Sequence, residues 1–285
     1  MDEVSVEEFW QHHPCGDMQV GGLDNFRRDY EAFFNEYDKY RYNKEGHILD
    51  CLDQIEFADK QTLEIGLGQG ADSEQIIRRG AKWSGIDLTA ESVERVGVRL
   101  ELKELPYQGL TQGSALEMPF EDNSFDIVFS HGVLHHIPEI GLAQSEISRV
   151  LRPDGMLVAM LYAKNSLNYW FSISIVRRLG LIACYLAPGF SSDEMVHQHV
   201  ANAREAGLFQ YLRMKNFIHR NTDGPLNPYS KVYDVRAVKE DFGKFDIVRC
   251  HKEFMHAPPL PAKKLPFAKS MGWHLWVEMV PKGAG

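Results

Sequence analysis

Leu63-Glu64-Ile65-Gly66-Leu67-Gly68-Gln69-Gly70-Ala71 places alternating glycines directly after a short apolar run. Residues 61–65 are predicted to form a buried strand and residues 73–79 a helix. Glycines at such a junction allow a tight turn and let a ligand approach the backbone without a clash against Cβ atoms. The helix N-terminus that follows offers free N–H groups. The stretch therefore predicts a ligand-binding strand, loop and helix.

An acidic residue follows these glycines at the distance expected of a ribose-binding carboxylate. Gly85-Ile86-Asp87-Leu88 ends the next predicted strand, about twenty residues further along the chain. Read as Gly66-x-Gly68-x-x-Ala71, the loop matches the fingerprint of dinucleotide-binding proteins. Read as Glu64-x-Gly66-x-Gly68-x-Gly70, it resembles motif I of the class I S-adenosylmethionine (SAM) methyltransferases. An ordinary strand-to-helix turn is the third interpretation of the glycines.

Strands and helices alternate regularly from residue 61 to residue 162. The predicted strands are 61–65, 82–88, 108–112, 126–130 and 156–162, and the predicted helices are 73–79, 91–105 and 143–151. Arg152-Pro153-Asp154-Gly155 is expected to be a turn, because Pro and Gly are frequent turn residues. This alternation predicts an α/β protein whose parallel sheet has helices on both faces.

The flanking parts of the chain differ from this alternating core. Residues 1–60 are predicted to be an N-terminal helical cap, because aromatic residues recur there at helical spacing. Residues 163–235 are expected to be a helical insertion after the fifth strand. Residues 236–285 supply the closing strands, 245–251 and 273–280. Ligands bind at the carboxyl ends of the strands in such sheets, so the insertion is predicted to be a lid over the site.

Four further blocks of sequence decide between the cofactor classes. Residues 112–120, 122–130, 131–138 and 146–155 each resemble the corresponding motif of the class I SAM methyltransferases. The resemblance is to the methyltransferase type 11 group, which includes ubiquinone and menaquinone enzymes, and it covers residues 60–163 in order. It implies that residues 61–162 are a SAM-binding, Rossmann-like core. The sheet is then doubly wound, with seven strands of which the last is antiparallel.

Weaker similarity extends into both flanks of the chain. His13-Pro14-Cys15-Gly16, Arg41-Tyr42 and Gly272-Trp273-His274-Leu275 resemble a bacterial subgroup whose methyl acceptors are mostly unassigned. The resemblance favours a SAM-dependent methyltransferase acting on a small molecule, at an O, N, S or C atom. An NAD-dependent oxidoreductase and a catalytically silent SAM-binding protein are the alternatives from other classes.

The resemblance also implies roles for individual residues toward SAM, whose product is S-adenosylhomocysteine (SAH). Asp87 is expected to accept both ribose hydroxyls, a geometry that one carboxylate suits. The family often has an acid at the position of Ser114, so the serine here is a departure, and adenine is expected to meet the Ser114 hydroxyl or nearby backbone groups. The cofactor-binding residues implied are Glu64, Gly66, Gly68, Gly70, Asp87, Leu88, Ser114, Ala115, Leu116 and Ser130.

Histidines cluster after the fourth strand and are candidate general bases. His131, His135 and His136 carry imidazoles that titrate near neutral pH. Tyr162, at the end of the fifth strand, is a further candidate at the same mouth. In each case a structural role is the alternative, as a cap on the next turn or as a sheet-edge aromatic. No carboxylate accompanies the histidines at a metal-ligand spacing, so no metal site is predicted.

Candidate acceptor-site residues lie in the cap and in the lid. They are Tyr30, Tyr37, Tyr42, His197, His199 and Asn227, and Trp170, Phe171, Tyr185 and Phe190 are expected to add apolar surface. Core packing is the alternative for the tyrosines, and turn chemistry for the polar lid residues. An apolar pocket with a few polar anchors is typical of small-ligand sites.

Composition limits the partners and the compartment. Thirty-one basic against 40 acidic side chains give a net charge of −9, which is unfavourable for broad nucleic-acid binding. The four cysteines form no CxxC pair, as in reduced compartments. The first residues are acidic, without the apolar core of a signal peptide, so a cytoplasmic location is expected. The oligomeric state is not predicted.

Residues 169–190 are the most apolar stretch of the chain. Arg177, Arg178, Gly180, Pro188 and Gly189 interrupt it, so a buried or surface-docking helix is expected rather than stable membrane insertion. The alternative function is methylation of a lipid-like acceptor, such as a quinone precursor, at a membrane surface. In that case Arg177 and Arg178 would face acidic headgroups.

Overall fold

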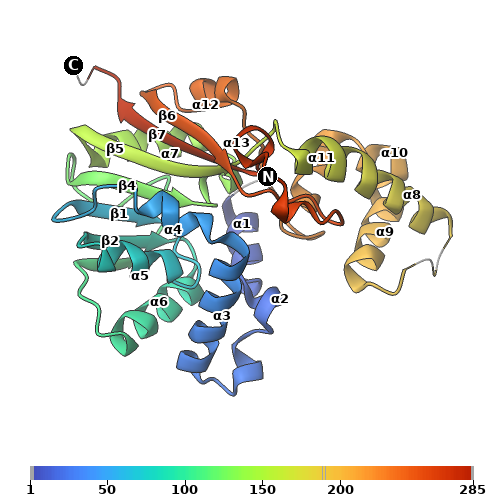
Figure 1. Cartoon of the computed structure of the whole chain (residues 1–285), viewed down its shortest axis with the longest axis horizontal. Coiled ribbons are helices and arrows are strands. Elements are labelled where there is room, and N and C mark those ends of the chain that lie inside the picture. Colours follow the sequence, from blue (N-terminus) through green and yellow to red (C-terminus); the bar gives the residue numbers. More distant parts are fainter. Residues whose placement is uncertain (1–2, 188, 190, 284–285) are drawn as a thin grey trace.

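A computed structural model describes residues 3–187, 189 and 191–283 of the chain. A twisted sheet with flanking helices forms the core, and a group of helices projects from one side of it (Figure 1). The strands are β1 (Gln61–Ile65), β2 (Lys82–Asp87), β3 (Gly109–Gln112), β4 (Phe125–His131), β5 (Leu151–Tyr162), β6 (Phe245–Glu253) and β7 (His274–Pro281).

The seven strands form one sheet in the order β3-β2-β1-β4-β5-β7-β6. β1 pairs in parallel with β2 and β4, β2 with β3, and β4 with β5. β7 is antiparallel to both β5 and β6. The predicted α/β fold, doubly wound with an antiparallel last strand, is therefore confirmed. The chain reverses its strand order beside β1, where ligands bind in such sheets.

One local prediction is wrong. Residues 152–155 are not a free turn, because β5 already begins at Leu151, which pairs with Phe125 of β4. The next pair is Ile127 with Met156, so the intervening residues of β5 form a bulge. Gly155 fits there because a Cβ would lie 2.9 Å from the Asp126 carbonyl oxygen. The Pro and Gly that signal a turn in the sequence thus shape an irregular strand.

Helices cover both faces of the sheet, as predicted. On one face, α7 (Ile140–Val150) and α12 (Val235–Asp241) pack against a core that includes Val128. On the other face, α4 (His47–Leu52), α5 (Ala71–Arg78) and α6 (Ala90–Leu102) pack around Phe129. Neighbouring residues of β4 thus enter different cores, because side chains alternate across a strand.

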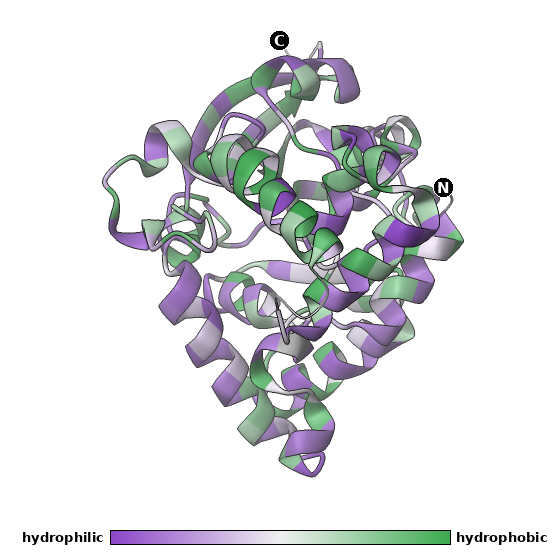
Figure 2. Cartoon of the chain, turned by 90° about the vertical axis from the view of Figure 1, so that its right-hand side faces the viewer, coloured by the Kyte–Doolittle hydropathy of each residue, from purple (hydrophilic) through white to green (hydrophobic). Residues whose placement is uncertain are grey.

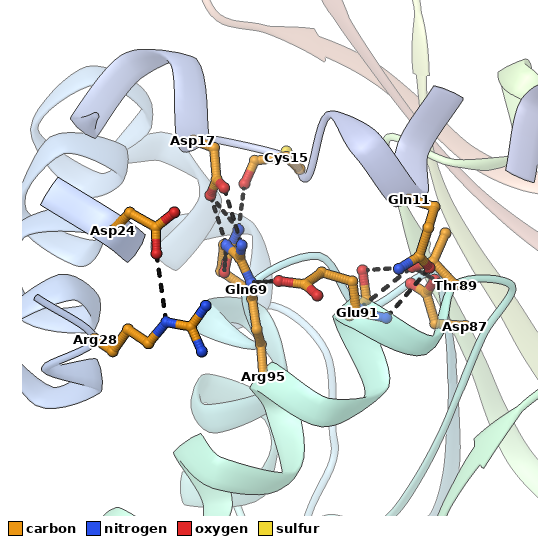
Figure 3. A network of polar contacts seen from close by, with 11 residues as sticks. Gln11, Cys15, Asp17, Asp24, Arg28, Gln69, Asp87, Thr89, Glu91 and Arg95 are labelled. Carbon is orange, nitrogen blue, oxygen red and sulfur yellow. Dashed lines mark hydrogen bonds and ion pairs between the residues drawn. The ribbon is translucent and has the colours of Figure 1, made fainter. Parts of the chain in front are cut away.

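The N-terminal residues are helical, as expected, and cover one edge of the core. The helices are α1 (Glu3–His12), α2 (Asp17–Val20), η1 (Leu23–Phe26) and α3 (Tyr30–Glu45). A polar network fastens this cap to the glycine loop (Figure 3). Gln69 donates to the Cys15 carbonyl at 2.8 Å, and Arg95 donates to both carboxylate oxygens of Asp17 at 2.6 and 3.0 Å.

Residues after β5 form the projecting group of helices, called the lid here. It comprises the π-helical η3 (Asn168–Arg177), α8 (Arg178–Leu186), α9 (Glu194–Ala206), α10 (Leu208–Tyr211), α11 (Met214–Phe217) and η4 (His219–Asn221). A hydrophobic cluster that includes Ile173, Tyr211 and Phe217 holds these helices together, and Phe254 and Trp273, beside the ends of β6 and β7, belong to the same cluster. The closing segments η5 (Ala262–Lys264) and α13 (Ala268–Met271) precede β7.

The helical segment 168–186 is long and apolar enough to cross a membrane, judged by length and composition alone. Trp170, Ile175 and Leu179 on it are 57%, 46% and 62% exposed. Figure 2 views the lid from its outer side and shows many hydrophobic residues along its front helices. Arg177 and Arg178, however, donate hydrogen bonds to the lid backbone at Asn221 and Leu212. Both arginines are thus tied to the lid backbone, and their orientation toward headgroups stays a prediction.

Candidate active site

The glycine loop has a backbone that only glycine adopts without strain. The φ angles of Gly66, Gly68 and Gly70 are +79°, +53° and +73°. A Cβ on Gly66 would lie 2.1 Å from Cγ2 and 2.8 Å from Cβ of Val133, so no side chain fits there. The loop therefore approaches the end of β4 as closely as the backbone allows.

Asp87 holds this loop from the end of β2. Its Oδ2 accepts from the Leu67 N–H at 2.7 Å, and its Oδ1 accepts from the Thr89 N–H and hydroxyl at 2.9 and 2.8 Å. Burial raises the pKa of Asp87, and these hydrogen bonds oppose that effect. A carboxylate has about four acceptor positions, and these three hydrogen bonds leave about one of them for a ribose hydroxyl.

A narrow cavity lies between the glycine loop, the end of β2 and helix α1. Six of the predicted cofactor residues line it: Glu64, Gly66, Gly68, Asp87, Leu88 and Ala115. Ile86, Leu88 and Ala115 give it apolar walls suited to an adenine ring. Glycine backbone, a carboxylate at a strand end and apolar walls are the groups that an adenosine with a charged tail requires, so the residues present fit SAM.

The other predicted cofactor residues lie behind this cavity. Gly70 is the N-cap of α5, and the Ser130 hydroxyl donates to the Ile65 carbonyl at 3.0 Å. The Ser114 hydroxyl accepts from the Leu116 N–H at 2.9 Å and donates to the Glu3 carboxylate. Glu3 itself lines the cavity. Glu3 of the cap thus places a carboxylate beside Ser114, the position at which the family often has an acidic residue.

Glu64 is a buried carboxyl at the base of the cavity. Its Oε2 accepts from the Trp83 indole N–H at 2.8 Å. Burial, which leaves it 2% exposed, raises its pKa to about 8, with Asp72 adding to the effect. The neutral acid is therefore the favoured form in the folded protein at pH 7.

The burial of Glu64 predicts that Glu64→Gln raises the free energy of unfolding by an amount that depends on pH. The folded pKa is raised above the unfolded value of about 4.3, so the folded state of the natural protein loses stability as pH rises from about 5 toward about 8. Gln cannot ionise and keeps an acceptor for Trp83. We expect the difference in unfolding free energy, variant minus natural, to grow over that range in urea titrations. A difference independent of pH would contradict the prediction.

Arg41, Asp72 and His131 form a buried cluster beside the glycine loop. Arg41 Nε donates to Asp72 Oδ1 at 3.2 Å, and Arg41 Nη2 lies 2.9 Å from His131 Nδ1. His131 Nδ1 lies 3.1 Å from Asp72 Oδ2. Burial by itself would raise the pKa of Asp72, but Arg41 and His131 hold that pKa well below its usual range.

A second cavity, of about 1100 Å³, lies between the cap, the strand ends and the lid. It meets the narrow cavity at a shared wall formed by Trp10, Cys15, Tyr37, Arg41, His131 and Gly132. The larger space therefore opens beside the strand ends where the predicted cofactor site lies, and residues of the lid line part of its wall.

Tyr162 and Asp223 meet on the wall of this larger cavity. The Tyr162 hydroxyl donates to Asp223 Oδ1 at 2.8 Å, and His136 Nε2 lies 3.4 Å from Asp223 Oδ2. Burial, with Asp223 adding to it, raises the pKa of Tyr162 well above its ordinary value. His135 is fully buried behind the Tyr162 ring and lines neither cavity; burial lowers its pKa well below the ordinary value.

The structure places some of the predicted acceptor-site residues on the larger cavity and the others away from it. Tyr37 and His199 line the larger cavity. Tyr30, Tyr42, His197 and Asn227 line neither cavity; the Tyr42 hydroxyl donates to the Ala71 carbonyl, and Asn227 is 1% exposed within its turn. Trp170 and Phe171 face outward instead, and Phe190 lies outside the described residues. Within residues 3–187, 189 and 191–283, no group of three His, Cys, Asp or Glu side chains is arranged to hold a metal ion.

This sheet order, with a glycine loop after β1 and an acid at the end of β2, defines a Rossmann-like methyltransferase fold. Residues 63–159 match the family model described as a methyltransferase domain. These residues are therefore a methyltransferase domain of the class I SAM-dependent type, whose co-substrate is SAM.

Curated relatives match the same part of the chain. A phthiotriol/phenolphthiotriol dimycocerosates methyltransferase of Mycobacterium ulcerans is 32% identical over 121 residues, 41% of this chain and 43% of that protein. A fatty-acid O-methyltransferase of Mycolicibacterium smegmatis is 32% identical over 104 residues, 36% of this chain and 37% of that protein. The chain thus spans less than half the length of these relatives.

Solved structures share the fold over most of the chain. A SAM-dependent methyltransferase from Aquifex aeolicus has a TM-score of 0.51 and 15% identity, covering 88% of this chain and 98% of that chain. An S-adenosylmethionine-dependent methyltransferase from Mesorhizobium loti has a TM-score of 0.51 and 16% identity, covering 83% of this chain and 97% of that chain.

Proposed function

We propose that the protein transfers a methyl group from SAM to a small-molecule acceptor held in the larger cavity. One observation carries the proposal: the cavity that fits SAM and the cavity under the lid meet at a shared wall that includes Arg41, His131 and Gly132. A donor and an acceptor bound on the two sides of that wall would face each other.

The residues of the narrow cavity bind and orient the cofactor in this proposal. Asp87 accepts from the ribose hydroxyls, and Arg41 donates to the carboxylate of the methionine part. When bound, SAM supplies an electrophilic sulfonium methyl group. Holding an acceptor in line with that group and excluding water accounts for most of the rate that such chemistry needs.

Asp87→Ala is expected to weaken SAH binding by about 1–3 kcal/mol, because the ribose loses a hydrogen-bonded carboxylate and the Leu67 and Thr89 donors lose their acceptor. Isothermal titration calorimetry measures the loss. Asp122→Ala, at a surface ion pair with Arg149, is the matched control and should bind SAH as the natural protein does. Equal SAH affinity in the two variants would contradict the role of Asp87.

Proton removal from the acceptor is assigned to Asp223, with Tyr162 and His136 positioning its carboxylate. Asp223 lines the larger cavity and accepts from Tyr162. The raised pKa of Tyr162 keeps its phenol protonated at neutral pH, which makes it a donor rather than a base. His131 is engaged with Arg41 and Asp72, and His135 is walled off, so neither is assigned this step.

A second candidate is methylation of a lipid-like acceptor at a membrane surface. The exposed apolar side chains of the segment 168–186 favour it, and relatives are named for lipid-type substrates. Co-sedimentation with liposomes distinguishes the candidates: strong, salt-sensitive membrane binding would favour the second. The absence of a nucleic-acid partner is a companion proposal, supported by the net charge of −9. A cytoplasmic location is proposed as well, supported by four cysteines without a CxxC pair.

Two measurements test the proposed function. Calorimetry should show SAH binding and no binding of NAD(H), and the reverse result would favour an oxidoreductase. A labelled-methyl assay with SAM and a metabolite extract should then yield a labelled product. SAH binding without any labelled product would favour a silent SAM-binding protein.

A further inference from the structure

Two guanidinium groups of the lid face the larger cavity without an acidic partner. Arg177 and Arg220 both line that cavity. Among the described residues, neither has a carboxylate oxygen within 4 Å, although ion pairs are frequent elsewhere in the chain. A largely buried positive charge that lacks a counter-ion is costly unless a ligand supplies the opposite charge.

The two arginines belong to one cluster. Arg177 Nη1 donates to the Asn221 carbonyl at 2.6 Å, next to Arg220 in the chain. The Arg220 guanidinium lies 5.3 Å from the centre of the Tyr211 ring, and the Tyr211 hydroxyl lies 2.7 Å from His199 Nδ1. Tyr211 thus links Arg220 to His199, a third cavity-lining residue.

The electrostatics agree with this geometry. Burial alone lowers the pKa of Arg177 to about 10, with no anion to oppose it. Burial, followed by the nearby charges of Arg177 and Arg220, lowers the pKa of His199 to about 4. The imidazole is therefore neutral at pH 7, and the two guanidiniums provide the positive charge at this end of the cavity.

Other charged groups around the cavity already have partners. Arg41 is paired with Asp72, and Lys44 donates to the Tyr40 hydroxyl at 2.9 Å. Asp193 accepts from the Met195 N–H at 2.8 Å as the N-cap of α9, and Asp223 accepts from Tyr162. Among the described residues, Arg177 and Arg220 are therefore the lid cations of this wall without a counter-ion within 4 Å; Lys44 of the cap, and the carboxylates of Asp193 and Asp223, have neutral partners.

The lid carries more basic than acidic residues, unlike the whole chain, and this also favours an anionic ligand. Residues 163–235 carry eight Lys or Arg against five Asp or Glu, whereas the whole chain carries 31 against 40. Apolar side chains, among them Val176, Leu181 and Phe217, surround the arginines on the cavity wall. A guanidinium fork matches the oxygens of a carboxylate or phosphate in two parallel hydrogen bonds.

We propose that Arg177 and Arg220 bind an oxyanion, a carboxylate or a phosphate monoester, at one end of an otherwise apolar methyl acceptor. This inference rests on the proposed function and names the substrate class. Neither arginine lines the cofactor cavity or the wall shared with it. The oxyanion therefore anchors the acceptor at the lid, and a different atom of the acceptor reaches the shared wall to be methylated.

The test uses decanoate, decyl phosphate and decanol as probes, titrated into SAH-loaded protein below their micelle concentrations. We expect both anions to bind about 10-fold or more tightly than decanol. Arg177→Gln and Arg220→Gln should each remove most of that preference, while SAH affinity stays unchanged and both variants unfold cooperatively on heating. Arg177→Lys, which keeps the charge but not the fork, should retain part of it.

Arg213→Gln is the matched control, because Arg213 is an exposed lid arginine and lines neither cavity. It should leave the preference for anions intact. Equal binding of decanoate and decanol, or equal loss in Arg213→Gln and Arg177→Gln, would overturn the proposal. If the natural protein does not bind SAH, that result counts against the proposed function. Failure of the proposed function is therefore distinguishable from failure of the oxyanion proposal.

Lipid headgroups carry the same chemistry, so phosphatidylglycerol vesicles form a second arm of the test. The arginines line a cavity rather than the outer face of the lid. We therefore expect any vesicle binding to be unchanged by Arg177→Gln. Vesicle binding that is lost in Arg177→Gln, with decanoate binding unaffected, would assign the arginines to a membrane surface and overturn the proposal.

Discussion

Gly66→Ala is expected to reduce SAH affinity by more than about 100-fold, the largest effect of any substitution in the glycine loop. The new Cβ would meet Val133 at 2.1 and 2.8 Å, and alanine at a φ of +79° is strained in itself. Backbone strain of this kind costs about 1–3 kcal/mol. Overpacking costs about 1–3 kcal/mol more. A loss of about 1.4 kcal/mol in binding free energy lowers the affinity tenfold. Calorimetry and thermal unfolding measure the two consequences.

The controls separate the clash from the strain. Gly66→Ala combined with Val133→Ala removes the clash but keeps the φ angle, so it should recover part of the SAH affinity. Gly141→Ala changes a helical glycine in α7 with no atom within 4 Å, and should raise the unfolding free energy by about 0.5–1 kcal/mol without affecting SAH. SAH affinity within threefold of the natural protein in Gly66→Ala would contradict the close approach of the loop.

The core of the fold could be predicted because its signals are local. The predicted strand 61–65 coincides with β1, and Lys82 begins β2 as expected. Glycines with positive φ and an acid at a strand end leave a trace in the sequence itself. The predicted turn at residues 152–155 shows the limit, because the same Pro and Gly are compatible with a bulge inside a strand.

The residues that form the site could be predicted only in part, because contacts between distant parts of the chain bring them together. Glu3 reaches Ser114 across 111 positions of the chain, and Asp223 of the lid reaches Tyr162 across 61. Neither pairing leaves a periodic or spacing signal. Arg41 belongs to the Arg41-Tyr42 pair that resembles the bacterial subgroup, but its role depends on Asp72, which lies in the first turn of α5.

Arg41→Met is expected to lower the unfolding free energy by about 3–5 kcal/mol and to weaken SAH binding as well. The side chains of Arg41 and Asp72 are 13% and 7% exposed, so removing the guanidinium leaves a buried carboxylate without its counter-ion. Arg41 also lines both cavities, and among the described residues the acidic group near its Nη1 is Glu45, 3.9 Å away and beyond hydrogen-bond distance. That nitrogen therefore keeps hydrogens free for the carboxylate of the cofactor.

The double variant Arg41→Met/Asp72→Asn separates these two roles. Replacing both partners removes the buried charge, so most of the lost unfolding free energy should return in urea titrations. SAH affinity should stay low, because no cation remains at the shared wall. Arg78→Met, at a pair with Glu74 in which Arg78 is 48% exposed, is the surface control and should cost at most about 1 kcal/mol. Recovery of SAH affinity together with stability would mean that Arg41 supports the fold alone, and the cofactor carboxylate would then need another partner.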